Sequence, residues 1–134
     1  MANAIYDKGK EEIFNGNIDF VNDTIKAALI DTGTYTLNTA THEDYDDLSG
    51  VVGTDATLSS VTVTDGDIDC ADITWSSVSG STVEAIVIYK DTGMTSTSTL
   101  LFYIDSNITG LPVTPSGTDI TLAVNASGLV SPMG

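Results

Sequence analysis

Short apolar runs, separated by clusters of turn residues, form the main pattern along the chain. The longest unbroken ones are Ala27–Ile30, Ala85–Tyr89 and Leu100–Ile104. Runs of this length are typical of strands that are buried on both faces. We therefore expect strands at Thr24–Ile30, Val83–Tyr89 and Leu100–Ile104 in the centre of a sheet. Their core residues are predicted to be Ile25, Leu29, Ile86, Ile88, Leu101 and Tyr103.

Weaker strand patterns fill much of the remaining sequence. They predict strands at Leu58–Thr64, Asp67–Asp72, Ile73–Val78 and Asp119–Asn125, with Leu129–Gly134 as a short last strand or a frayed end. Asp65–Gly66 has the composition of a type I′ hairpin turn. About seven to nine strands at this spacing are typical of an all-β fold, an antiparallel β-sandwich or a small barrel.

One N-terminal helix is expected before the first strand. Apolar residues recur at helical spacing over Ala4–Asn15, with Asn3 as a candidate N-cap and Gly16 as a C-terminal stop. A shorter helical turn is expected at His42–Leu48, with Tyr45 and Leu48 facing inward. The predicted organisation is an N-terminal helix or arm over residues 1–17 and a single β-sandwich domain over residues 18–134.

The charge balance excludes several classes of partner. The 134 residues contain 19 acidic side chains against four lysines and no arginine, for a net charge of -15. Binding to a nucleic-acid backbone or to an anionic membrane requires clustered Lys and Arg, so neither partner is expected. The first residues have no basic and apolar leader pattern, so we expect synthesis in the cytoplasm without a signal peptide.

Candidate catalytic residues are few. Cys70 is the only cysteine, and it is expected to be a buried or half-buried structural thiol. His42 is the only histidine, at helical spacing from Asp46. The triplet Asp–Thr–Gly at 31–33 and 91–93 resembles the aspartic-protease motif, but each copy follows a strand end as a plain turn does. We therefore predict that the protein is not an enzyme and needs no cofactor.

Alternating carboxylates in the predicted hairpin are the one candidate metal site. Asp65, Asp67, Asp69 and Asp72 supply the hard oxygen ligands that calcium prefers. The EF-hand order of ligands is absent, and the same pattern describes a solvated strand face beside a turn. The solvated face is the preferred interpretation, and no metal is expected to be required.

Segments along nearly the whole chain resemble a family of small virion proteins encoded by tailed bacteriophages. The segments that carry the resemblance are Met1–Lys8, Ile18–Asp19, Asp23–Asp31, Val63–Gly66, Ala71–Thr74, Val78–Gly80, Val83–Gly93, Tyr103–Asp105, Thr109–Pro115 and Asp119–Thr121. The chain departs from the family near its end. The family usually places a Trp after the Asp–Ile–Thr segment, where this chain continues Leu122–Asn125.

The resemblance implies a virion structural protein, a capsid decoration (cement) protein that stabilises the shell and has the major capsid protein as its partner. Self-association into a dimer or trimer is left open. The alternative is a tail or fibre module that binds host glycans, for which an exposed Trp75 would be the natural platform. The expected capsid contacts are in the N-terminal segment Ala2–Phe14 or in the proline-bracketed loop Leu111–Pro115, where a free sheet edge could pair with a capsid strand. They are Ile5, Tyr6, Ile13, Phe14, Leu111, Pro112, Val113 and Pro115.

Overall fold

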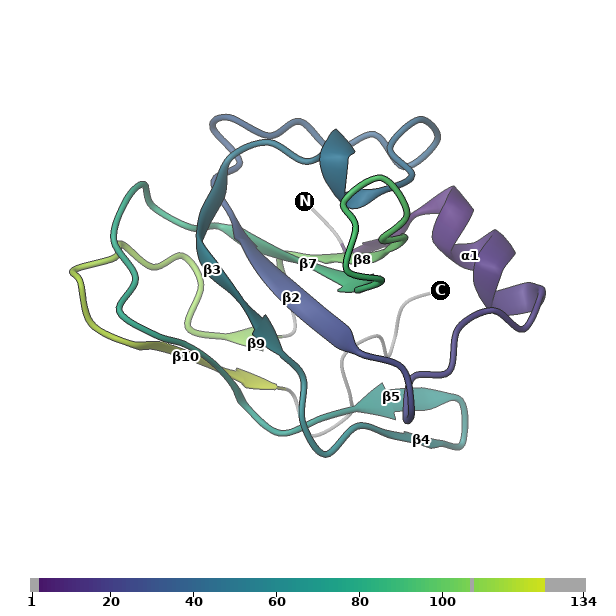
Figure 1. Ribbon diagram of the computed structural model, residues 1–134. Helices are drawn as coiled ribbons and strands as arrows, with labels where there is room; N and C mark the ends of the chain where they lie inside the picture. Colours follow the sequence, from purple (N-terminus) through teal and green to yellow (C-terminus); the bar gives the residue numbers. More distant parts are fainter. Residues whose placement is uncertain (1–2, 107, 125–134) are drawn as a thin grey trace.

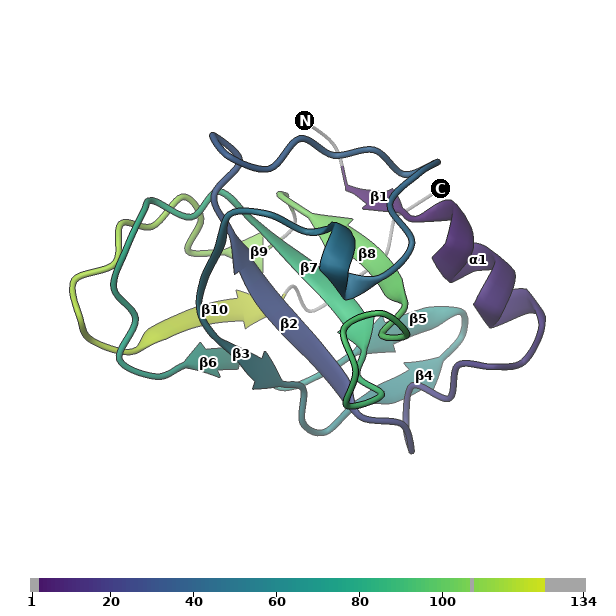
Figure 2. The same ribbon diagram turned by 45° about the horizontal axis from the view of Figure 1, so that its top comes forward.

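A five-stranded antiparallel sheet is the centre of the fold, with the strand order β1-β8-β7-β2-β3 (Figure 1; β1 is labelled in Figure 2). The computed structural model describes residues 3–106 and 108–124. The strands of this sheet are β1 (Ala4–Ile5), β2 (Ile25–Ile30), β3 (Val51–Thr57), β7 (Ala85–Lys90) and β8 (Leu100–Ile104). The three strands predicted from the longest apolar runs are β2, β7 and β8, and their central position is confirmed.

A smaller sheet and a hairpin complete the strand content (Figure 2). The smaller sheet has the order β6-β10-β9, and β4 pairs with β5 in the hairpin. Their bounds are β4 (Thr62–Thr64), β5 (Asp67–Asp69), β6 (Ile73–Trp75), β9 (Ile108–Thr109) and β10 (Ile120–Val124). The predicted all-β antiparallel class is therefore confirmed, in a sandwich-like form and not as a closed barrel. The described residues form ten strands, and two of these, β1 and β9, are too short to produce a periodic pattern.

The large sheet is buried on both faces, which explains its unbroken apolar strands. On one face, Ile25, Ala27 and Leu29 of β2 pack toward the smaller sheet. On the other face, Ala28 and Ile30 pack with residues from the long connection between β2 and β3. All six core residues predicted from the sequence are buried, with exposed fractions of 3% or less.

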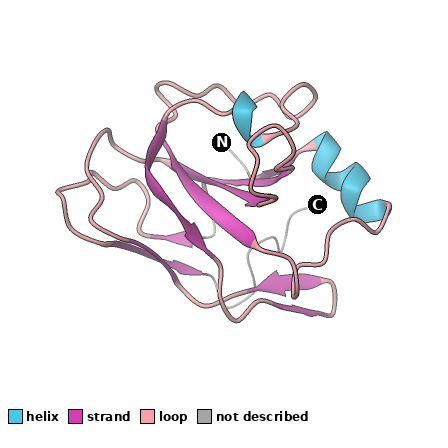
Figure 3. Ribbon diagram, viewed as in Figure 1, coloured by secondary structure: helices cyan, strands magenta, loops and turns pink. Residues whose placement is uncertain are grey.

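The helix α1 (Asp7–Phe14) is shorter than predicted because the chain before it is part of the sheet (Figure 3). Ala4 and Ile5 pair with Tyr103 and Phe102 of β8. The N-terminal segment, which the sequence pattern placed outside the sandwich, is thus an edge strand followed by a packed helix. At its C-terminus α1 is stopped as predicted by Gly16, which follows the C-cap Asn15 and has a φ of +78°.

Other strand bounds also differ from the prediction, and the strands expected at Asp67–Asp72 and Ile73–Val78 are shorter, as β5 and β6. Of the strand expected at Leu58–Thr64 only Thr62–Thr64 (β4) forms, because β3 already ends at Thr57 and Ser60 adopts a positive φ of 52°. The β3 strand itself was missed, since Gly53 interrupts its apolar pattern. The turn at Asp65–Gly66 is confirmed, with positive φ at both residues. The predicted last strand, Leu129–Gly134, lies outside the described residues.

The connection between β2 and β3 covers one face of the large sheet. It contains the short helix η1 (Tyr45–Asp47), which confirms the predicted helical turn. Tyr45 and Leu48 are partly buried against the sheet, as predicted. Backbone hydrogen bonds from Tyr45 N to Ser98 O (2.9 Å) and from Leu100 N to Glu43 O (2.9 Å) fasten the connection to the β7–β8 turn.

Candidate functional site

A cleft lies where β2 ends and β7 begins. It has a volume of about 490 Å³ and lies between the β2–β3 connection and the ends of β7 and β8. Its lining consists of Thr32, Tyr35, Thr36, Leu37, Glu84, Tyr103 and Asp105. Two carboxylates, two phenol rings and two threonine hydroxyls therefore converge on one cleft.

The electrostatic character of this cleft is negative. Glu84 and Asp105 contribute carboxylates, and none of the lining residues is a lysine. Burial, and then the charge of Asp105 and the proximity of Tyr35 and Glu84, raise the pKa of Tyr103 to about 12. The Tyr103 phenol is thus neutral at physiological pH.

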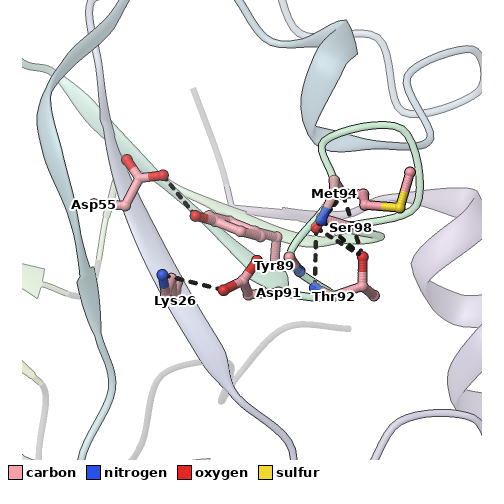
Figure 4. Close-up of polar contacts among 8 residues, drawn as sticks. Lys26, Asp55, Tyr89, Asp91, Thr92, Met94 and Ser98 are labelled. Atoms are coloured by element: carbon pink, nitrogen blue, oxygen red, sulfur yellow. Dashed lines mark hydrogen bonds and ion pairs between the residues drawn. The ribbon is translucent and has the colours of Figure 1, made fainter.

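A second, smaller pocket of about 200 Å³ lies at the opposite end of the β2–β7 pair. There the Tyr89 hydroxyl donates a hydrogen bond of 2.6 Å to Asp55 Oδ2 (Figure 4). The Tyr45 ring packs against the Tyr89 ring, with centroids 4.8 Å apart. Burial and the Asp55 carboxylate raise the pKa of both tyrosines. Asp55 Oδ1 is buried without a hydrogen-bond partner in the described part of the chain.

The turn that carries Met94 borders this pocket and is internally braced. Ser98 Oγ donates to Met94 O (2.7 Å) and accepts from Thr92 N (3.1 Å), and Thr92 Oγ1 also donates to Met94 O (3.2 Å). Asp91 pairs with Lys26 at 3.1 Å, as Figure 4 shows. The Met94 residue is 63% exposed, so a fixed backbone presents an apolar side chain to solvent.

The candidate histidine site is not assembled as an acid–base pair. His42 Nδ1 lies 2.7 Å from the Tyr35 hydroxyl, which in turn lies 2.8 Å from the Tyr6 hydroxyl. This chain of hydrogen bonds ties the β2–β3 connection to the N-terminal segment. Asp46, the expected partner of His42, is exposed. The arrangement is one that orders a loop.

The two Asp–Thr–Gly triplets are turns at opposite ends of the sheet. Asp31 Oδ1 accepts from Gly33 N (2.9 Å), and Asp91 Oδ1 accepts from Gly93 N (3.0 Å). Asp31 follows β2 and Asp91 follows β7, and these strands are antiparallel neighbours. The two carboxylates of one chain are therefore not brought together, and each one stabilises its own turn.

The predicted capsid contacts in the N-terminal segment are only partly accessible. Tyr6 is 0% exposed, which corrects its assignment as a contact residue, because its side chain is enclosed between β8 and the β2–β3 connection. Ile5 and Ile13 are partly buried against the core. Phe14 is 83% exposed at the end of α1. Among these four residues, Phe14 alone presents a large apolar surface.

The proline-bracketed loop offers less free backbone than expected. Val113 pairs with Val83 through hydrogen bonds of 2.8 and 2.9 Å in an isolated antiparallel bridge. Leu111 and Val113 pack partly against the core, and Pro112 is exposed. Pro115 is half-buried. The backbone of Val113, which was expected to be free for a capsid strand, is therefore already hydrogen-bonded to Val83.

The four aspartates of the calcium hypothesis do not gather into a metal site. Asp69 Oδ1 accepts from Cys70 N (2.8 Å), and Asp72 Oδ1 accepts from Val124 N (3.0 Å). Within residues 3–106 and 108–124, no group of three His, Cys, Asp or Glu side chains is placed to hold a metal ion. Asp69 and Asp72 instead hold backbone groups of the hairpin and of β10.

Two single residues are enclosed in the core. Trp75 is 1% exposed, so it cannot serve as a platform for a sugar ring. Cys70 is buried, as predicted. Burial, followed by the nearby Asp69 and Asp72 carboxylates, raises the pKa of its thiol to about 11, which makes it a poor nucleophile.

Sequence reasoning missed the residues of the cleft. Glu84 stands between apolar residues just before β7, and Tyr103 was assigned to the core. The opposite side of the cleft is formed by the segment Thr32–Leu37, an irregular loop that has no periodic sequence pattern.

No protein-family model matches the chain, and no curated protein matches its sequence. In the described part of the chain, no helix has the length and apolar character needed to cross a membrane.

Proposed function

We propose that the protein is a virion structural protein of a tailed bacteriophage, a capsid decoration protein that binds the outer face of the assembled shell and stabilises it. The support from the sequence is the resemblance that extends along nearly the whole chain. Such a protein is made in the host cytoplasm and ends up on the virion, where its partner is the major capsid protein.

The exposed aromatic ring of Phe14 is the structural observation that carries the proposal. The ring is 83% exposed at the end of α1, on a chain with a net charge of -15. Val21 in the following turn is 57% exposed. Large exposed apolar side chains are typical of contact sites, and aromatic residues frequently anchor interfaces.

The segment that carries Phe14 is rigid enough to present it. Gly16 N donates to Ile13 O (3.1 Å) and Asn17 N donates to Glu12 O (2.9 Å), which is a Schellman motif. Lys90 Nζ donates to Asn17 O (2.9 Å) and forms an ion pair with Asp23 (3.2 Å). The contact surface is therefore held at both ends before any partner binds, which lowers the entropic cost of binding.

The strong negative charge of the chain is also compatible with many copies lying close together on a shell. Decoration places copies close together, and a strongly acidic surface limits association between free molecules. Contacts that bridge capsid subunits stabilise the shell because they form only on the assembled particle.

The direct test compares decorated particles with particles from which the protein has been stripped or deleted. We expect the undecorated particles to release DNA at a lower temperature. Equal release temperatures would contradict stabilisation. Imaging that finds the protein only on the tail, at a few copies per particle, would replace the proposal with the tail-module alternative.

A matched pair of variants tests the contact surface. Phe14→Ser should leave the melting temperature of the free protein nearly unchanged, because the ring is exposed, and should weaken rebinding to stripped capsids at least tenfold. Val63→Ser, which also removes an exposed apolar side chain (52% exposed), should rebind like the parent. Equal rebinding by both variants would rule out the Phe14 surface.

A further inference from the structure

The cleft at the end of β2 contains a carboxylate with one oxygen already positioned. Glu84 Oε1 accepts hydrogen bonds from Thr32 N (2.9 Å) and Thr32 Oγ1 (3.1 Å). The backbone of Glu84 is fixed by its own hydrogen bond to Ile30 O (3.1 Å). Within the described residues no donor reaches Oε2 of this carboxylate. The free oxygen is thus held in one orientation without a partner.

A buried tyrosine side chain also lines the cleft without a hydrogen-bond partner. Tyr103 is only 3% exposed. It lines the cleft with Glu84, and the described residues supply no hydrogen bond to its hydroxyl. The hydroxyl itself is not enclosed but opens to the cleft. It is therefore available to a ligand that carries hydrogen-bonding groups.

The lysines of the chain do not fill this role. Lys26 and Lys90 lie at the far end of the β2–β7 pair, where they form ion pairs with Asp91 and Asp23. Lys8 and Lys10 pair with acidic residues of α1. Glu84 lies beside the other end of β2. Because a six-residue strand is about 20 Å long, Glu84 is separated from Lys26 and Lys90 by about the length of the strand.

We propose that this cleft binds a guanidinium group, presented as an arginine side chain by a partner protein. A guanidinium is planar and has five donors, so it can reach the free Glu84 oxygen and the Tyr103 hydroxyl together. Leu37, which is half-buried in the lining, offers apolar surface for the aliphatic stem of the arginine. The proposal is independent of the capsid assignment, since it depends only on the cleft.

The test uses N-acetyl-arginine amide as the probe and follows the amide resonances of the full chain by NMR. We expect saturable shifts confined to the cleft residues, with a dissociation constant on the order of 1–10 mM. The isosteric citrulline derivative, which is uncharged, and the lysine derivative should each bind at least tenfold more weakly. Equal binding of citrulline would overturn a charge-based site, and equal binding of lysine would overturn the guanidinium assignment.

Two variants with the same change of charge locate the site. Glu84→Gln should weaken arginine amide binding at least tenfold, and it should still fold because the amide oxygen can accept the Thr32 hydrogen bonds. Glu43→Gln changes an exposed acid outside the lining and should bind like the parent. Equal loss in both variants, or the absence of saturable shifts in the parent, would overturn the proposal.

Discussion

The indole nitrogen of Trp75 donates a hydrogen bond of 2.9 Å to the backbone carbonyl of Ala27. Trp75 belongs to the smaller sheet and Ala27 to the central strand β2, so this contact joins the two layers of the sandwich. The pairing of β2 with β3 shifts its register between Ala27 and Leu29. The register shift therefore begins at Ala27, the residue of β2 that accepts the hydrogen bond from the Trp75 indole.

Replacing Trp75 with Phe should destabilise the protein measurably. The smaller ring leaves the Ala27 carbonyl without its donor and leaves a void in a fully buried position. We expect a loss of about 2–4 kcal/mol in the free energy of unfolding, since an unsatisfied buried group and a cavity both contribute. Urea unfolding followed by circular dichroism measures it. A loss below about 0.5 kcal/mol would show that the contact contributes little.

Gly9 allows α1 to lie directly on β8. A Cβ atom at this position would stand 2.6 Å from Leu100 O and 3.0 Å from Leu101 Cα, both backbone atoms. In an exposed helix, Gly→Ala stabilises by up to about 1 kcal/mol. Here the clash should reverse the sign, and we expect Gly9→Ala to cost about 1–3 kcal/mol. Thermal unfolding of Gly9→Ala against the exposed-site variant Lys10→Ala tests this, and a stabilised Gly9→Ala would contradict the close packing.

The centre of the fold was predictable because its strands combine long apolar runs with clear turns. Ile86 and Ile88 could be placed in the core on this basis alone, and the hairpin at Asp65–Gly66 followed from turn chemistry. Pairing partners, however, are set by contacts between residues far apart in the chain. The local sequence around Ala4–Ile5 does not indicate that this segment pairs with β8. Tyr6, which follows it, was therefore predicted to lie on the surface.

The cleft could not be predicted for the same reason. Glu84 and Thr32 are 52 positions apart in the sequence, and only the antiparallel pairing of β2 with β7 brings them together. Tyr103 has the same pattern in the sequence as any buried aromatic residue of β8. Tyr103 lines a cleft only because the irregular segment Thr32–Leu37 lies beside it. The path of that segment is set by tertiary contacts and not by a local sequence pattern.

Calcium should have little effect on stability, and the hairpin aspartates are the place to test this. Asp69 and Asp72 already accept hydrogen bonds from Cys70 N and Val124 N. We expect millimolar calcium to shift the melting temperature of the parent and of Asp67→Asn by the same small amount. A stabilisation of several degrees that Asp67→Asn abolishes would establish a calcium site.

The buried thiol of Cys70 should make the protein less stable at alkaline pH. The pKa of this thiol is raised from 9.0 to about 11 in the folded chain, first by burial and then by Asp69 and Asp72. The folded state therefore favours the neutral thiol, and this contribution is fully present below pH 9. It is lost as the pH rises from about 9 to about 11, by up to about 3 kcal/mol at 1.36 kcal/mol per pKa unit.

The variant Cys70→Ala separates this effect from the titration of tyrosines, which also begins near pH 10. The variant starts from a lower free energy of unfolding because it loses packed volume, but its stability should fall less steeply between pH 8 and about 10.5. Urea unfolding at a series of pH values measures both slopes. Parallel curves for the parent and the variant would mean that the Cys70 thiol is not shifted in the folded state, whereas converging curves would place its ionisation in the alkaline range.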